Sequence, residues 1–391
     1  MKDKRLLPPP SEVPEFLHSS PFFPTFEPDE ENHIRPPEHM PSILEILKSK
    51  PARVAFTFFL ALTTFIYFRT AVYEFHVWTR LAGPSCSLSA PVYPPSSWDA
   101  PDVDWTKFAY TQYATNLNYL CNSVMIFETL HRLQSKPDRL MLYPSKYSAP
   151  DAVADTPERR LLLKARDEYG VKLEAVEVVH EKSALYAGPN WADSYTKLLA
   201  FNQTQYSRLL VLDSDSTILQ LMDDLFLLPD AKAVMPKAWW LDYPFVTSHI
   251  MLIQPSASEF SRIQDAIRDA HLGFYDMEIV NMLYGRECLV LPHKPYALLT
   301  GELRSGDHSK WLKGGHENWD PDSVMKQAKL VHFSDHPLPK PWSATKSMRE
   351  SAQPVCLDGE GQGQGEGCRE RKIWMGLYED FKTRRKNICD M

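Results

Sequence analysis

The chain has 391 residues, of which 43% are hydrophobic and 12% aromatic, and it carries a formal net charge of −7. This length suits one large α/β domain with additional segments, and the negative charge argues against a nucleic-acid-binding protein, which normally has a basic face. The six cysteines lack Cys-x-x-Cys spacing, which argues against a structural zinc site, although their even number permits disulfides in an oxidising compartment.

Residues 1–50 are rich in proline and acidic side chains, and this composition predicts a disordered tail. An uncharged apolar run follows at residues 54–68, with Lys48, Lys50 and Arg53 just before it. The run begins too far along the chain for a cleaved signal peptide, so we predict a single membrane anchor over residues 51–72. Because the basic residues precede the anchor, the tail is expected on the cytoplasmic side. A buried core helix is the alternative interpretation.

Residues 73–105 contain many prolines and serines, a composition typical of a stem or spacer. Beyond this stem, strands are predicted at residues 107–113, 139–143, 171–179, 208–212, 248–254 and 289–292. Helices are predicted at residues 119–133, 157–169, 194–201, 258–270 and 277–284. Strands that alternate with helices predict a Rossmann-like mixed, mainly parallel sheet.

We therefore assign residues 106–342 to one α/β domain. From residue 343 onward the pattern loses periodicity, and residues 343–391 are predicted to form a C-terminal tail with a Gly-rich loop at residues 359–367. Cys356 and Cys368 flank this loop, and either a local disulfide or two free thiols fits the pattern. Asn202 and Thr204 form an N-glycosylation acceptor pattern, which is usable only if the domain is luminal.

Two carboxylates, Asp213 and Asp215, come directly after the predicted strand at residues 208–212. In an open α/β sheet, ligands bind beyond the carboxyl ends of the strands. Two hard oxygen ligands at that edge are suited to a divalent cation that also binds a diphosphate. An acidic turn after a strand is the alternative interpretation.

Two other polar segments are candidates for the same edge. His332 ends a short apolar run, and Lys340 follows it in a Pro-rich loop. A His beside two carboxylates completes a nitrogen and oxygen ligand set for an ion such as Mn²⁺, and a nearby Lys neutralises a phosphate. Residues 113–119 (YATNLNY) carry small polar and aromatic side chains suited to a base and ribose. A structural His and a structural turn are the alternatives.

Six segments, in this order, carry a resemblance to a known family: YATNLNYLCNSV, SYTKLLAF, LLVLDSDSTILQLMDDLF, YDMEIVNMLYG, LVLPHKPYALLTG and HFSDHPLPKPW. The chain resembles the retaining glycosyltransferases of family 8, which include glycogenin, galactinol synthase and the lipopolysaccharide galactosyltransferases. It looks most similar to the fungal Golgi members, the glucose N-acetyltransferases. The resemblance covers roughly residues 106–342. It implies a GT-A type nucleotide-diphospho-sugar transferase fold behind the anchor, in a single-pass type II Golgi membrane protein with a luminal catalytic domain.

The resemblance also implies site residues. Its metal ligands fall on Asp213, Asp215 and His332. Its nucleotide and phosphate contacts, together with the serine between the two aspartates, give the cofactor-binding residues Tyr113, Thr115, Asn116, Tyr119, Lys197, Ser214 and Lys340.

The chain departs from the family pattern near the reacting sugar. Asp276 is followed by Met277 where the family commonly has Gln, so Asp276 or Glu278 is expected to assist there. The spacing from His332 to Lys340 is longer than usual. Residues 248–250, Ser-His-Ile, replace the common Asn-Ser-Gly, which indicates a changed pocket for the donor sugar.

The implied function is metal-dependent transfer of N-acetylglucosamine from a UDP-sugar to a mannose-containing glycan. Retention is expected through front-face transfer, in which a metal ion such as Mn²⁺ and the lysines stabilise the departing diphosphate. The alternative enzyme is a glucosyl- or galactosyltransferase of the same family. A catalytically inactive glycan-binding relative is the alternative without activity, and Met277 keeps it open.

Overall fold

The structure is a computed structural model, and it describes residues 50, 54, 56–65, 67, 91–94, 103–147, 155–180, 193–270, 274–313, 318–356 and 368–391. The chain divides into two compact units, Met1–Val72 and Tyr73–Met391. The predicted tail over residues 1–50 and most of the stem lie outside the described residues, as does part of the predicted anchor.

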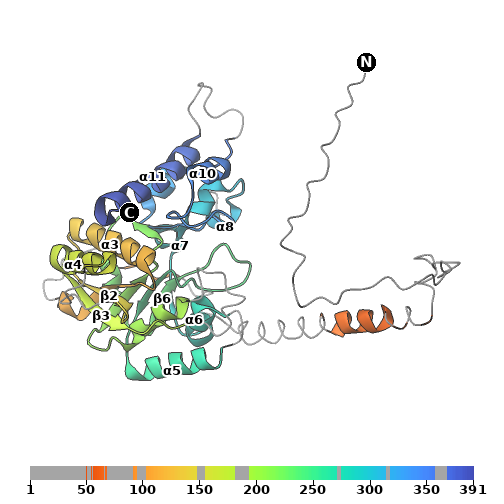
Figure 1. Cartoon of the computed structure of the whole chain (residues 1–391), viewed down its shortest axis with the longest axis horizontal. Coiled ribbons are helices and arrows are strands. Elements are labelled where there is room, and N and C mark those ends of the chain that lie inside the picture. Colours follow the sequence, from red (N-terminus) through yellow and green to blue (C-terminus); the bar gives the residue numbers. More distant parts are fainter. Residues whose placement is uncertain are drawn as a thin grey trace, which may run out of the picture. The chain divides into compact units, whose positions relative to one another are not determined.

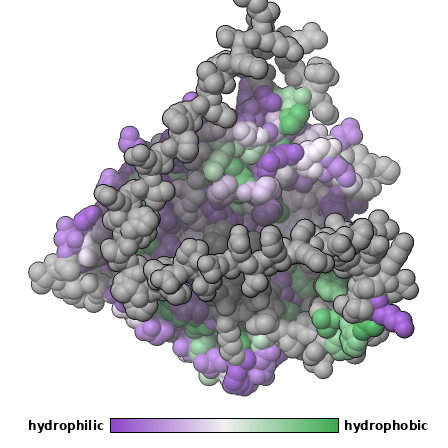
Figure 2. Space-filling model, turned by 45° about the vertical axis from the view of Figure 1, so that its right-hand side comes forward, coloured by the Kyte–Doolittle hydropathy of each residue, from purple (hydrophilic) through white to green (hydrophobic). Residues whose placement is uncertain are grey.

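In the first unit, residues 56–65 are helical and their large apolar side chains are exposed. Within the described ranges, no helix is both long and apolar enough to cross a membrane. Hydrophilic side chains make up much of the described surface in the space-filling view, where apolar side chains gather in smaller areas (Figure 2).

The second unit is built on a seven-stranded sheet with the strand order β3-β2-β1-β4-β7-β6-β8 (Figure 1). Its first four strands in space are parallel, and β7 runs antiparallel to both of its neighbours. At the far edge, β6 and β8 pair in parallel. The strands are β1 (Phe108–Tyr113), β2 (Asp138–Pro144), β3 (Val171–Val176), β4 (Arg208–Leu212), β6 (Ala233–Pro236), β7 (Ile250–Ile253) and β8 (Leu289–Leu291). The predicted mixed, mainly parallel sheet is therefore confirmed.

Helices cover both faces of this sheet (Figure 1). On one face, α3 (Leu117–Arg132) and α4 (Pro157–Tyr169) share a hydrophobic core with alternate side chains of the strands. On the other face lie η4 (Ser194–Asn202), α5 (Ala257–Arg268) and α6 (Asp276–Tyr284). Every residue of β4 is buried, as expected for a strand that is covered on both sides.

Local signals explain why several boundaries agree with the prediction. Thr156 caps α4, Pro157 occupies its first turn, and Gly170 ends it with a φ of 64°, which is the usual placing of proline and glycine around a helix. The predicted helix at residues 194–201 is instead the 3₁₀-helix η4, and the strand predicted at 171–179 ends earlier, at Val176.

A second, three-stranded sheet lies beyond the carboxyl end of β4. It has the order β5-β10-β9 and consists of β5 (Ser216–Ile218), β10 (Leu330–His332) and β9 (Leu298–Leu299). The antiparallel pairing of β10 with β5 places His332 opposite Ser216. These strands have only two or three residues, which is too short for a periodic pattern to identify them.

The described part of residues 343–391 is not the aperiodic tail that the sequence analysis predicted. It contains α10 (Lys346–Ala352) and α11 (Arg369–Cys389), and α11 lies alongside α3 (Figure 1). A disulfide between Cys121 and Cys389 joins the two helices. The sequence does contain a helical pattern here, because the buried residues of α11 follow helical spacing: Trp374, Tyr378, Phe381, Arg385 and Cys389. The many charged residues between them concealed it.

Of the two alternatives for Cys356 and Cys368, the structure has the disulfide. The other short elements are η3 (Trp105–Lys107), η5 (Asp223–Leu227), α7 (His293–Tyr296), η6 (Thr300–Arg304), α8 (Ser309–Leu312) and α9 (Pro321–Gln327).

Stability should depend on pH through Glu302 of η6. Burial, with a smaller contribution from Asp307, raises the pKa of Glu302 to about 8, and burial lowers the pKa of His308, whose Nδ1 lies 2.6 Å from Glu302 Oε1. A folded-state pKa above the unfolded value gives stability that is lost as pH rises. We therefore expect Glu302 to lower the free energy of unfolding between about pH 5 and pH 8, with a slope of at most about 1.4 kcal/mol per pH unit. The lowered pKa of His308 acts in the opposite direction below about pH 6.5 and reduces this slope.

Denaturant unfolding at several pH values measures this slope. Glu302→Gln keeps a neutral partner for His308 and should flatten the curve over the same range. An equally steep slope in the variant would contradict the assignment.

Candidate functional site

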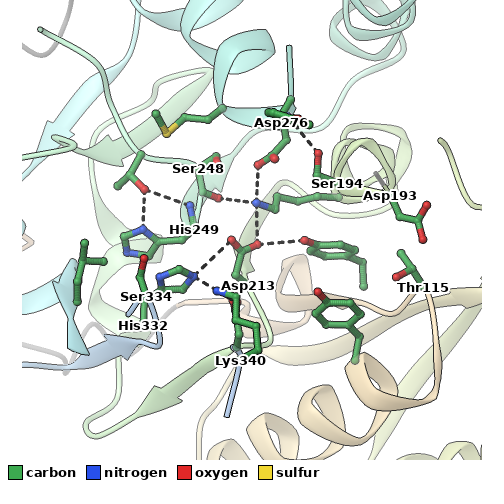
Figure 3. Close-up of a pocket in the computed structure, with 18 of the residues that line it drawn as sticks. Thr115, Asp193, Ser194, Asp213, Ser248, His249, Asp276, His332, Ser334 and Lys340 are labelled. Carbon is green, nitrogen blue, oxygen red and sulfur yellow. Dashed lines mark hydrogen bonds and ion pairs between the residues drawn. The ribbon is translucent and has the colours of Figure 1, made fainter. Parts of the chain in front are cut away.

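A cavity of about 340 Å³ lies beyond the carboxyl ends of β1 and β4 (Figure 3). Its size is within the range of small-molecule sites. Ten of the residues predicted from the sequence line it: Tyr113, Thr115, Tyr119, Lys197, Asp213, Asp215, Asp276, Glu278, His332 and Lys340. The prediction that these segments meet at one edge of the sheet is thus consistent with the fold.

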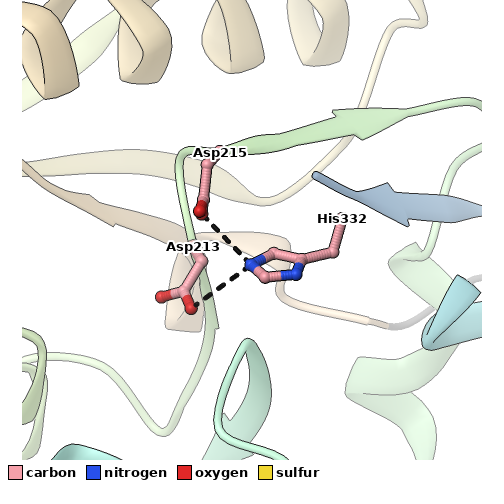
Figure 4. A group of neighbouring side chains, drawn as sticks. All are labelled: Asp213, Asp215 and His332. Carbon is pink, nitrogen blue, oxygen red and sulfur yellow. Dashed lines mark ion pairs between the residues drawn. The ribbon is translucent and has the colours of Figure 1, made fainter. Parts of the chain in front are cut away.

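Three side chains in this cavity form a candidate metal site (Figure 4). The ligand atoms of Asp213, Asp215 and His332 all lie within 4.8 Å of one another. His332 Nε2 is 3.2 Å from Asp215 Oδ1 and 4.0 Å from Asp213 Oδ2. One nitrogen and two carboxylate ligands that converge on one point suit a divalent cation such as Mn²⁺.

Short backbone pairings hold these three residues in place. Asp213 follows β4, and its N–H donates to the carbonyl of His249 at 2.9 Å. Asp215 precedes β5, and its carbonyl accepts from Phe333 N at 2.9 Å. Since β5 pairs with β10, the ladder itself brings His332 to the acidic pair.

The electrostatics of the site also fit a bound cation. Burial raises the pKa of Asp213 against the opposing effect of Lys197, and the charges of Asp215 and Asp276 add to the increase. A divalent ion would relieve this repulsion, because it stabilises both ionised carboxylates. The residues present therefore fit the metal that the sequence analysis predicted.

Lys340 reaches the site from the loop after β10. Its Nζ lies 2.5 Å from Asp215 Oδ2 and donates to the carbonyl of Phe333 at 2.8 Å. Burial tends to raise the pKa of Asp215, but Lys340 and His332 outweigh it and hold this pKa well below its usual range. Asp215 is therefore ionised, and its carboxylate holds the Lys340 ammonium at the candidate metal site.

Lys197 lies at the centre of a buried charge network. It is only 2% exposed, and its Nζ is 2.6 Å from both Asp213 Oδ1 and Asp276 Oδ2 and donates to Ser248 O at 3.2 Å. Burial opposes its charge, but the two carboxylates raise its pKa above the usual value. The ammonium is thus ionised and already satisfied by protein groups, although the sequence analysis assigned it to a phosphate.

The two predicted catalytic carboxylates have different environments. Burial would raise the pKa of Asp276, but Lys197 outweighs burial, with further hydrogen bonds from Ser248 and Ser194, so this pKa is lowered. Glu278 Oε2 instead accepts from the backbone N–H of Tyr275 at 2.9 Å, which caps α6, and burial raises its pKa. Of the two, Asp276 is the ionised carboxylate that pairs with Lys197. Glu278 also stabilises the N-terminus of α6 as its cap.

The end of β1 supplies aromatic groups on the opposite side of the cavity. The hydroxyl of Tyr113 donates to Asp213 Oδ1 at 3.2 Å, and the ring of Tyr119 meets Trp342 edge to face at 5.2 Å. Two predicted cofactor-binding residues do not line the cavity. Asn116 caps α3 through its side chain, and Ser214 is buried between the two aspartates.

His249 is a buried lining residue whose role the sequence analysis missed. Its ring stacks on His332 with 4.9 Å between centroids. Its Nδ1 is 2.5 Å from Thr247 Oγ1 and its Nε2 is 3.2 Å from the carbonyl of Tyr296. Burial, together with the neighbouring His332, lowers the pKa of His249 far below its usual value. The only signal was the unusual sequence at residues 248–250.

Asp193 and Ser194 also line the cavity, and the sequence analysis did not place them there. The site as a whole combines a candidate divalent-cation ligand set with a lysine beside it. Such an arrangement stabilises negative charge that develops on a leaving group.

No family model matches the sequence. Among curated proteins, the chain is 49% identical over 294 residues to Glucose N-acetyltransferase 1 of Gibberella zeae, an alignment that covers 74% of this chain and 64% of that relative, just under two thirds of its length. It is 42% identical over 328 residues to Glucose N-acetyltransferase 1 of Aspergillus fumigatus, covering 80% of this chain and 83% of the relative.

A solved structure, galactosyltransferase LgtC in complex with donor and acceptor sugar analogues, superimposes with a TM-score of 0.42 at 12% identity and covers 70% of this chain and 95% of LgtC. Because this TM-score is low, the structural similarity carries no argument, and family membership rests on the two sequence relatives.

Proposed function

We propose a function on the basis that this chain belongs to the glucose N-acetyltransferase 1 family of glycosyltransferases. In this proposal the protein transfers a sugar from a UDP-sugar to a glycan acceptor with the help of a divalent metal ion. The donor that we propose is UDP-N-acetylglucosamine, because two relatives carry the name Glucose N-acetyltransferase 1. The acceptor that we propose is a mannose-containing glycan, an expectation that comes from the resemblance.

The observation that carries this proposal is the convergence of Asp213, Asp215, His332 and Lys340 on one point of the cavity. The first three would hold the ion, for which we propose Mn²⁺ because of the mixed nitrogen and oxygen ligands. When bound, such an ion acts as a Lewis acid that stabilises the negative charge of the departing diphosphate.

In this proposal, different residues of the cavity bind the nucleoside, neutralise the diphosphate and hold the carboxylates in place. Tyr113, Thr115 and Tyr119 line the side of the cavity where we place the nucleoside. Lys340 would exchange its contact with Asp215 for one with the diphosphate, which neutralises charge in the leaving group. Lys197 keeps its two carboxylates ionised and fixed.

We propose retention at the anomeric carbon by front-face transfer. The carboxylate of Asp276 is engaged by Lys197 at 2.6 Å, which makes it a poor nucleophile and suits it to orienting a sugar hydroxyl. The departing phosphate would take the proton from the acceptor hydroxyl. The GT-A type fold is part of this proposal, and the mixed sheet with its acidic pair at the carboxyl end of β4 supports it.

We further propose a type II protein of the Golgi membrane, anchored through residues 51–72 and with a luminal catalytic domain. The disulfides Cys121–Cys389 and Cys356–Cys368 support the luminal part, because disulfides persist in oxidising compartments. Asn202 is exposed at the end of η4, so its side chain is accessible to glycosylation there.

The full chain, purified in detergent, should release UDP from UDP-N-acetylglucosamine when Mn²⁺ and a mannose-containing acceptor are present. A chelator should abolish the release, and added Mn²⁺ should restore it, because the diphosphate has no other divalent counter-ion. Coupled detection of UDP across UDP-N-acetylglucosamine, UDP-glucose and UDP-galactose measures this.

Release from UDP-glucose or UDP-galactose instead would replace the proposed donor with the alternative enzyme. Metal-dependent UDP binding without release from any donor would favour a catalytically inactive glycan-binding relative. Release that a chelator leaves unchanged would refute the metal site.

A further inference from the structure

Lys340 is held differently from the three candidate metal ligands. Asp213 and Asp215 flank the strand ends of β4 and β5, and His332 lies in β10, so backbone ladders fix all three. Lys340 instead lies in a loop between β10 and α10 that has no strand of its own. An ammonium on a flexible stem must be positioned by its surroundings if it is to meet a diphosphate reproducibly.

The buried carboxylate of Asp335 anchors this loop. Its Oδ1 accepts from Trp374 Nε1 at 3.0 Å, and its Oδ2 accepts from the hydroxyl of Tyr378 at 2.8 Å. The hydroxyl of Thr300 donates to the same oxygen. The backbone carbonyl of Asp335 accepts from Leu338 N at 2.8 Å, which closes the turn on the way to Lys340. Two of the four side-chain donors to the carboxylate come from α11; the others are Thr300 and Arg304, whose Nη1 lies 3.5 Å from Asp335 Oδ1.

Aromatic packing joins α11 to both ends of the loop. At the start, Phe333 meets Tyr378 and Phe381 edge to face at 5.3 and 5.0 Å. At the end, the ring of Trp342 lies 6.3 Å from that of Phe381. Because Trp342 also contacts Tyr119 of the cavity wall, the helix supports two sides of the site through one cluster.

The helix is itself firmly attached to the sheet domain. Its last turn is tied to α3 by the disulfide Cys121–Cys389, and Arg384 donates to Met125 O and to Thr129 Oγ1 on the same helix. All of α11 lies outside residues 106–342, the part of the chain that the sequence analysis assigned to the α/β domain.

We propose that α11 acts as a clamp on the Lys340 loop, and that Asp335, held by Trp374 and Tyr378, is a positioning residue that places Lys340 against the diphosphate of the donor. This inference rests on the proposed function, since it assumes that Lys340 meets a phosphate. Donor affinity then depends on α11, although the α11 side chains named above do not line the cavity.

The test uses the double variant Trp374→Phe/Tyr378→Phe in the full chain, which removes the two hydrogen bonds that α11 donates to Asp335 and keeps aromatic side chains in the core. Calorimetric titration with UDP in saturating Mn²⁺ should show affinity weakened about tenfold, comparable to the loss of one hydrogen bond to a charged group. Binding of Mn²⁺ alone should be unchanged, because ladders and not the loop hold its ligands.

Lys340→Ala provides the decisive comparison. If the clamp acts through Lys340, adding the double variant to Lys340→Ala should cause little further loss of UDP affinity, because positioning is irrelevant once the ammonium is gone. Additive losses would overturn the proposal, as would unchanged UDP affinity in the double variant.

Arg384→Gln is the matched control on the same helix, because it weakens the contact of α11 with α3 and leaves Asp335 untouched. It should lower the thermal midpoint while UDP affinity stays within about twofold. An equal loss of UDP affinity in this control would show a general stability effect and overturn the clamp. If the unaltered chain fails to bind UDP with Mn²⁺, the proposed function fails first and the inference with it.

Discussion

Asp215→Asn should lower the rate of sugar transfer by about a thousandfold, because a bound metal ion contributes several kcal/mol to stabilising the leaving group. The substitution preserves shape but removes the charge that His332 Nε2 approaches to 3.2 Å and Lys340 Nζ to 2.5 Å. The metal would retain one carboxylate ligand, and Lys340 would lose its partner. Steady-state assays of UDP release, with the Mn²⁺ concentration varied, measure the loss.

The same assay needs a comparison that separates charge from folding. Asp230→Asn removes an exposed carboxylate that pairs with Arg208, at the opposite end of β4 from Asp213, and should leave the rate within about twofold. Near-ultraviolet circular dichroism should show that both variants are folded. If Asp215→Asn retained more than a tenth of the activity at saturating Mn²⁺, Asp215 would not be a metal ligand.

Lys197→Met should lower the free energy of unfolding by about 3–5 kcal/mol, the usual effect of removing one partner from a buried ion pair. The substitution keeps the length of the side chain but leaves Asp213 and Asp276 buried without the ammonium that lies 2.6 Å from each. Chemical denaturation of the full chain, followed by tryptophan fluorescence, measures the change.

A second variant shows whether the charge is responsible. Lys197→Met/Asp276→Asn removes one of the two stranded carboxylate charges and should recover part of the lost stability. Stability that is unaffected by Lys197→Met, or a double variant less stable than the single one, would contradict the buried network. Transfer activity should be lost in both, since Asp213 is shared with the candidate metal site.

Sequence reasoning succeeded where the relevant pattern is local. The apolar run before Asp213 and Asp215 predicted the strand β4 with its bounds as observed, because a strand buried on both faces has a continuous run of apolar side chains. The bounds of α4 were equally predictable from the capping Thr156 and from Gly170 at its end. Such signals act over a few neighbouring residues.

The candidate site was only partly accessible in this way. Composition and resemblance together named ten of the residues that line the cavity, including the three candidate metal ligands. They did not predict that Lys197 is satisfied by two carboxylates, that Glu278 caps α6, or that His249 stacks on His332. Each of these depends on which atoms meet when distant segments pack.

By itself, the sequence determined the mixed, mainly parallel sheet, the acidic pair at its carboxyl edge and the family to which the chain belongs. The resemblance implied that His332 joins that pair, and the tertiary structure supplies the physical cause, because the pairing of β5 with β10 connects residues far apart in the chain. Only the tertiary structure decided that α11 belongs to the domain, where Trp374 and Tyr378 bind Asp335 and Cys389 joins Cys121. The spacing of apolar residues can indicate a helix such as α11, but it does not show which distant segment the helix packs against, since that choice depends on how the whole core is filled.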